Sequence, residues 1–139
     1  MISRRHLIHL GTVSVVSGLA GCTSIPAFGT VGLRFRNYRE ESCNPQVQTE
    51  ILDTTVLDQE FELQPGSPDD PYSRIEPDAV SNVPTGVDYT AKLFLNGDEV
   101  NSIEGTADCV GRQGDFDEEI DINIGYGRHE EILIDGSKC

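Results

Sequence analysis

The feature that most constrains this chain is the repeated alternation of apolar and polar residues beyond residue 30. A period of two predicts strands that bury one face and expose the other. No stretch carries the apolar stripe with a 3.6-residue period that an amphipathic helix needs. We therefore expect an all-β domain, with strands within the runs 31–35, 47–51, 60–63, 87–95, 120–124 and 132–134.

Turn signals separate these runs. Asn96-Gly97 is the strongest short hairpin signal, so a further strand is expected after it. Segments 65–71, 83–86 and 125–128 are rich in Pro or Gly and predict other turns. About seven short strands, spaced near ten residues apart, are typical of an antiparallel β-sandwich of the immunoglobulin-like kind. A small barrel is the alternative.

The first 22 residues follow a different pattern. Arg4 and Arg5 form a charged start, and residues 7–20 form a moderately apolar stretch. That stretch is too short to cross a hydrocarbon core of about 30 Å as a helix. Its length and its flanks predict a cleaved signal helix.

Two motifs in this segment resemble known export signals. The run Ser-Arg-Arg-His-Leu-Ile at positions 3–8 resembles a twin-arginine export motif, with Leu7 and Ile8 where Phe and Leu are usual. The run Leu19-Ala20-Gly21-Cys22 matches the lipobox of prokaryotic lipoproteins. This resemblance implies that the chain is cleaved before Cys22, that lipid is attached to the Cys22 thiol, and that the domain folds before export.

These signals predict three parts of the chain. Residues 1–21 are the signal peptide, 22–30 a lipidated tether and 31–139 the β-sandwich domain. The tether is short and contains Pro and Gly. The remaining length supports one modest hydrophobic core.

The charge balance is strongly acidic. Loss of Arg4 and Arg5 with the signal peptide leaves eight basic residues against 24 acidic ones, a net charge of −16. Such a surface repels phosphate backbones, so we expect no nucleic-acid partner. Many carboxylates, few lysines and a preference for Arg resemble haloarchaeal proteins. The whole chain resembles small haloarchaeal lipoproteins that carry a twin-arginine signal and an acidic β-sandwich.

Four cysteines are present, and Cys22 is assigned to lipid. An extracellular location permits a disulfide. The expected strand directions bring Cys109 and Cys139 to the same end of the sandwich, which favours that pair. The rival pair is Cys43 with Cys109, spaced like an immunoglobulin inter-sheet bridge but without a Trp to pack on it.

Little in the sequence indicates catalysis. Beyond the signal peptide His129 is the only histidine, and its position between Arg128 and two glutamates predicts an exposed turn. No nucleophile elbow, phosphate-binding loop, dinucleotide fingerprint or zinc-protease motif occurs. We expect a protein that is not an enzyme and needs no cofactor.

One acidic segment is a weak candidate for a Ca²⁺ site. Asp115, Asp117 and Glu119 fall in the run 115–121 and offer the oxygen ligands that Ca²⁺ prefers. Their spacing is not that of an EF-hand. In so acidic a chain a solvated acidic face is the alternative explanation.

The resemblance implies a protein anchored in membrane lipid through Cys22, on the extracellular face of the cell membrane. We expect the domain to act as a non-enzymatic binding or interaction module, with a membrane-protein complex as a possible partner. Phe94 is a candidate for an exposed apolar docking patch. The alternative is a surface protein that binds a ligand or Ca²⁺ through the 115–121 segment.

Overall fold

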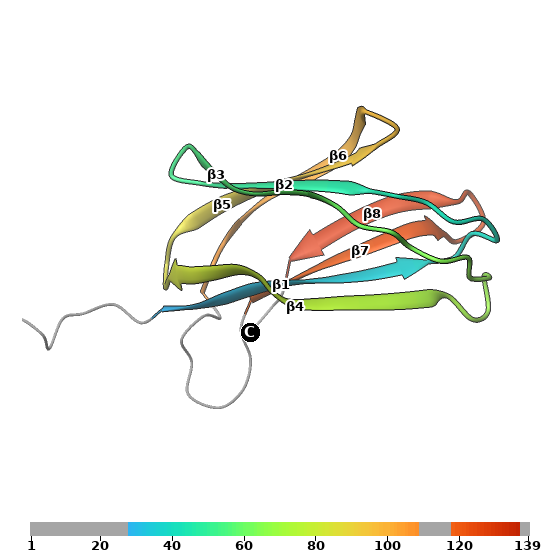
Figure 1. The fold of residues 1–139 in the computed structure, drawn as a ribbon, viewed down its shortest axis with the longest axis horizontal. Helices are drawn as coiled ribbons and strands as arrows, with labels where there is room; N and C mark the ends of the chain where they lie inside the picture. Colours follow the sequence, from blue (N-terminus) through green and yellow to red (C-terminus); the bar gives the residue numbers. More distant parts are fainter. Residues whose placement is uncertain (1–27, 109–117, 137–139) are drawn as a thin grey trace, which may run out of the picture.

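The computed structural model of the chain describes residues 28–108 and 118–136 (Figure 1). This part contains eight strands and no helix. The strands are β1 (Phe28–Asn37), β2 (Gln46–Ile51), β3 (Thr54–Glu60), β4 (Tyr72–Pro84), β5 (Asp88–Leu95), β6 (Asp98–Thr106), β7 (Glu118–Tyr126) and β8 (Glu131–Gly136).

The strands form two four-stranded sheets. One has the order β4-β1-β7-β8 and the other the order β3-β2-β5-β6. Neighbouring strands are antiparallel except β1 and β7, which are parallel. The all-β prediction is therefore confirmed, in an arrangement consistent with a sandwich (Figure 1).

The core lies between the two sheets and follows the sequence alternation. On β1, Leu33 and Phe35 are fully buried, and they lie opposite Ile120 and Ile122 of β7. The facing sheet contributes buried residues from β2 and β5, such as Val47, Ala91 and Leu93. Burial of these apolar side chains, at about 25 cal/mol per Å², is the main force that holds the sheets together.

Two strand boundaries differ from the sequence prediction. The run 60–63 was expected to be a strand, but the strand in this region is β3 (Thr54–Glu60), which shares only Glu60 with the predicted run. Phe61 and Leu63 are nevertheless buried, and Leu63 forms an isolated bridge with Cys43. Alternation in the sequence indicates only which side chains are buried. An extended segment that lies beside a sheet therefore gives the same sequence pattern as a paired strand. In addition, β1 begins at Phe28, so the last three residues of the expected tether, 28–30, form strand.

Strand β4 was not expected from the sequence. It lies at the edge of its sheet, most of its residues are exposed or half-buried, and it contains Pro77. An edge strand tolerates Pro because one side needs no hydrogen bonds. Its weak alternation explains why about seven strands were predicted instead of eight.

The strand directions define two ends of the domain (Figure 1). The N-terminal end holds the start of β1, the turns 52–53 and 85–87, and the last residues of β6 and β8. The distal end holds the 38–45 and 61–71 loops and the turns 96–97 and 127–130. The Asn96-Gly97 hairpin is confirmed between β5 and β6, and both residues have positive φ, at 54° and 84°.

Candidate binding surface

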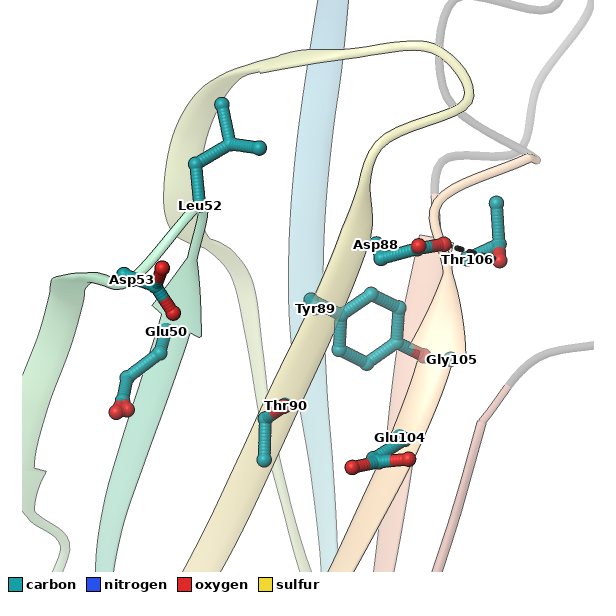
Figure 2. A pocket seen from close by; sticks show the side chains of 9 residues that line it. All are labelled: Glu50, Leu52, Asp53, Asp88, Tyr89, Thr90, Glu104, Gly105 and Thr106. Carbon is teal, nitrogen blue, oxygen red and sulfur yellow. Dashed lines mark hydrogen bonds between the residues drawn. The ribbon is translucent and has the colours of Figure 1, made fainter.

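A strongly acidic groove lies on the outer face of the β3-β2-β5-β6 sheet (Figure 2). It opens to solvent near the N-terminal end and has a volume of about 510 Å³. Four carboxylates line it, together with Leu52, Tyr89, Thr90, Gly105 and Thr106. The carboxylates belong to Glu50, Asp53, Asp88 and Glu104.

Strand register places these carboxylates on neighbouring strands. Glu50 of β2 and Glu104 of β6 both pair with Thr90 of β5, so the two carboxylates flank one hydroxyl. Directly opposite residues lie about 5 Å apart at Cβ. At the rim, the Thr106 hydroxyl donates a hydrogen bond of 2.8 Å to Asp88 (Figure 2). The groove therefore presents hard oxygen acceptors over several neighbouring positions.

The charge around the groove is predominantly negative. The four strands of this sheet contain seven acidic residues and a single basic residue, Lys92. A concave surface with one sign of charge concentrates counter-ions and raises the encounter rate of oppositely charged groups. Such a surface suits a cationic group better than a phosphate or carboxylate.

Glu118 is buried at the same end of the molecule, between the sheets. It is 1% exposed, and neither carboxylate oxygen has a hydrogen-bond partner among the residues that the structure describes. Burial, and secondarily the charge of Asp108, raises the pKa of this carboxyl group to about 7. The sequence prediction placed Glu118 in the acidic run 115–121 and not in the core, although it is spaced two residues before the buried Ile120.

Tyr89 closes this end of the core beside Glu118. Its ring occupies space left by two glycines, because a Cβ at Gly105 or at Gly136 would come within 2.8 Å of the Tyr89 side chain. Gly105 belongs to one sheet and Gly136 to the other. Burial and the charge of Glu118 raise the pKa of Tyr89 to about 12. Tyr89 is thus a neutral bridge between the two sheets at neutral pH.

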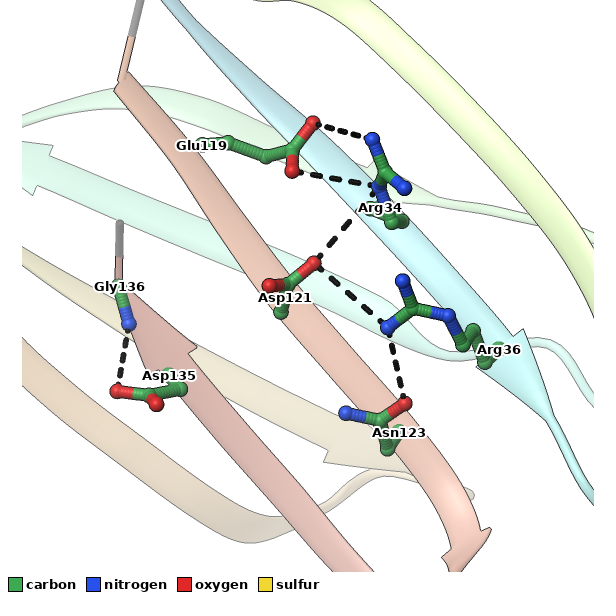
Figure 3. Close-up of polar contacts among 7 residues, drawn as sticks. All are labelled: Arg34, Arg36, Glu119, Asp121, Asn123, Asp135 and Gly136. Atoms are coloured by element: carbon green, nitrogen blue, oxygen red, sulfur yellow. Dashed lines mark hydrogen bonds and ion pairs between the residues drawn. The ribbon is translucent and has the colours of Figure 1, made fainter. Parts of the chain in front are cut away.

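The opposite outer face, on the β4-β1-β7-β8 sheet, carries an ionic ladder (Figure 3). Arg34 Nε lies 3.2 Å from Glu119 Oε1 and 3.9 Å from Asp121 Oδ1. Arg36 Nη1 lies 3.9 Å from the same Asp121 oxygen and donates a hydrogen bond of 3.4 Å to Asn123. These contacts join β1 to β7 across their parallel register.

The ladder changes the interpretation of the acidic segment. Glu119, a predicted Ca²⁺ ligand, is paired with Arg34, while Asp115 and Asp117 lie outside the described residues. Within residues 28–108 and 118–136, no three His, Cys, Asp or Glu side chains come together as a metal-binding group.

The predicted export and lipidation residues precede the part of the chain that the structure describes. They are Arg4, Arg5, the run Leu19-Ala20-Gly21 and Cys22. The cysteines of the predicted disulfide, Cys109 and Cys139, also lie outside the described residues. No helix in the part that the structure describes is long and apolar enough to cross a membrane.

Cys43 is the one cysteine within the described ranges, and it is a free thiol. It lies at the distal end, where its amide and carbonyl both hydrogen-bond to Leu63. Partial burial raises the pKa of its thiol, with Arg39 acting in the opposite direction. A raised pKa lowers the thiolate fraction and therefore the reactivity of the thiol.

Two other residues singled out in the sequence, His129 and Phe94, lie in the described part of the chain. His129 is exposed in the turn between β7 and β8, as expected. Phe94 is only half-buried, and the most exposed large apolar side chains lie elsewhere, on both sheets and at the turns. They are Phe28, Leu52, Val56, Ile75, Val100, Tyr126 and Leu133.

Comparison with known proteins gives no further guide to this site, because no protein-family model and no curated protein matches the chain.

Proposed function

We propose that this chain is a lipid-anchored protein of the extracellular membrane face, and that its domain is a non-enzymatic module that binds a cationic group of a partner protein. The observation that carries the binding proposal is the groove with four carboxylates on neighbouring strands. The two N-terminal motifs support the anchor, which would hold the groove near membrane-embedded partners.

The length of the tether supports a position close to the membrane. Cys22 precedes Phe28, the first residue of β1, by six residues. An extended chain spans at most about 3.5 Å per residue, so the N-terminal end of the domain would lie within about 20 Å of the lipidated cysteine.

An immunoglobulin-like sandwich and a haloarchaeal habitat remain parts of the proposal. Two facing four-stranded sheets support the first, and the acidic composition supports the second.

Geometry also supports the proposed Cys109–Cys139 disulfide over its rival. One groove at the N-terminal end is lined by both Asp108 and Gly136. Asp108 directly precedes Cys109, and Gly136 lies three residues before Cys139. Cys43 lies at the distal end, beside Leu95 and Asn96. A strand as long as β5 separates the two ends by roughly 25 Å, far beyond the reach of a disulfide.

The proposed binding face is tested by crosslinking the lipidated protein to its partners in living cells at native salt. A Glu50→Gln/Glu104→Gln variant should lose a partner that the wild type captures reproducibly. An Asp58→Asn/Glu60→Gln variant removes the same charge from β3 of the same sheet, outside the groove, and should keep that partner. Equal capture by all three proteins would contradict the proposal.

A further inference from the structure

The turn between β2 and β3 exposes a leucine in a backbone conformation that leucine rarely adopts. Leu52 has a φ of 51° and Asp53 a φ of 63°, both in the left-handed region. Gly, Asn and Asp are the residues usually found there, because a branched side chain crowds the backbone. The Leu52 side chain is 77% exposed, the highest value among the large apolar residues that the structure describes.

The turn geometry itself does not require a leucine. The Asn96-Gly97 turn at the distal end has the same two-residue length and also positive φ at both positions, with the residues that are usual there. A leucine at the equivalent place in the 52–53 turn therefore adds strain and exposes apolar surface without stabilising the fold. Strain of this kind is retained where the residue has a function.

Leu52 lies at the end of the domain from which the proposed anchor extends. Ile51, the residue before it, pairs with Tyr89 near the start of β5, and Phe28 at the start of β1 pairs with Pro84 at the end of β4. Only three residues connect β4 to β5, so both features belong to the N-terminal end (Figure 1). Phe28 is itself 52% exposed.

We infer that the N-terminal end faces the lipid surface and that Leu52 inserts into it. This inference rests on the proposed lipidation of Cys22, whose six-residue separation from Phe28 holds this end against the bilayer. Insertion removes the leucine side chain from water, which offsets the strain of the turn. Repulsion between Asp53 and anionic headgroups is screened at high ionic strength. The acidic groove, which Leu52 borders, would then open beside the membrane.

Tryptophan fluorescence can test the orientation directly, because the chain contains no Trp. Full-length lipidated protein would be prepared with Leu52→Trp, Phe28→Trp or Tyr126→Trp and reconstituted in phosphatidylglycerol vesicles in molar salt. Tyr126 is a matched distal control, since it is 48% exposed and aromatic. The vesicles carry bromine on the acyl chains, which quenches an indole only at close range.

The inference predicts that Leu52→Trp and Phe28→Trp lose most of their emission in brominated vesicles and that Tyr126→Trp does not. If vesicle-bound protein shows no quenching in Leu52→Trp, or equal quenching in Tyr126→Trp, the orientation is wrong while the anchor stands. A blue shift in Leu52→Trp without quenching would indicate a protein contact and also overturn the lipid assignment. If mass spectrometry shows no lipid on Cys22 and the protein does not bind the vesicles, the proposed function is wrong as well.

Discussion

The two sheets contain the same number of acidic residues and use them differently. The strands of each sheet carry seven acidic side chains. The β4-β1-β7-β8 sheet also carries Arg34, Arg36 and Arg74, all of which form ion pairs with neighbouring carboxylates. The other sheet has only Lys92 and forms the acidic groove. The arginines thus neutralise part of the negative charge on one face, whereas the opposite face keeps a concentrated negative charge that suits a cationic group.

The largest difference between the two faces should appear in how variants of each face change the salt concentration that the domain needs to fold. We expect the folded domain to lose its structure in dilute buffer, because the Debye length grows from about 3 Å at 1 M salt to about 10 Å at 0.1 M. A variant with Glu50→Gln, Asp88→Asn and Glu104→Gln should fold at lower salt than the wild type. Arg34→Gln/Arg36→Gln should need more salt. Circular dichroism during a salt titration measures both shifts, and unchanged spectra down to millimolar salt would contradict the prediction.

The proposed disulfide should contribute the next largest effect, because it would join β6 of one sheet to β8 of the other. Reduction, or Cys139→Ser, should lower the free energy of unfolding by roughly 3–4 kcal/mol in the chain-entropy model. Cys43→Ser serves as the control and should leave the bond intact. Peptide mapping without reductant identifies the pair, and a Cys43–Cys109 peptide would show that the assignment is wrong.

Glu118 should make stability depend on pH. Its folded-state pKa of about 7 exceeds the ordinary value of 4.5, so the folded state holds a proton that the unfolded chain has released between these values. This contribution is fully present below pH 4.5 and is lost as the pH rises through 7. Glu118→Gln keeps a neutral side chain, so above pH 7 it should be more stable than the wild type by about 1–3 kcal/mol.

Chemical denaturation at several pH values measures that difference. Glu119→Gln changes the neighbouring carboxylate, which points to the ladder instead of the core, and should give no such gain at high pH. A constant difference between Glu118→Gln and the wild type across this pH range would mean that the buried carboxyl group keeps its ordinary pKa.

Removal of one ladder arginine should have the smallest effect. Half-exposed ion pairs contribute about 0–1 kcal/mol, so Arg34→Gln should lower the free energy of unfolding by no more than about 1 kcal/mol. Lys92→Gln on the other sheet should change it by less than about 0.5 kcal/mol. Urea denaturation measures both free energies of unfolding. A larger decrease for Lys92→Gln than for Arg34→Gln would contradict the proposed difference between the two faces.

The sequence predicts the fold better than the site. Alternation and Asn96-Gly97 identify the β5–β6 hairpin and the apolar core, because both signals are local. Strand β4 was not predicted, because an edge strand that contains Pro77 need not show alternating apolar and polar residues. The groove could not be found from the sequence, since Glu50, Asp88 and Glu104 come together only through the register of β2, β5 and β6. Glu118 could have been found, because it shares the inward spacing of Ile120.

The proposed function requires that the β3-β2-β5-β6 face binds a partner and that the ladder face does not. A photo-crosslinking amino acid at Thr90, in the floor of the groove, can be compared with one at Asn123 on the opposite sheet, in the lipidated protein in cells. We expect a reproducible protein adduct from position 90 and none from position 123. An adduct from position 123 alone, or none from either position, would contradict it.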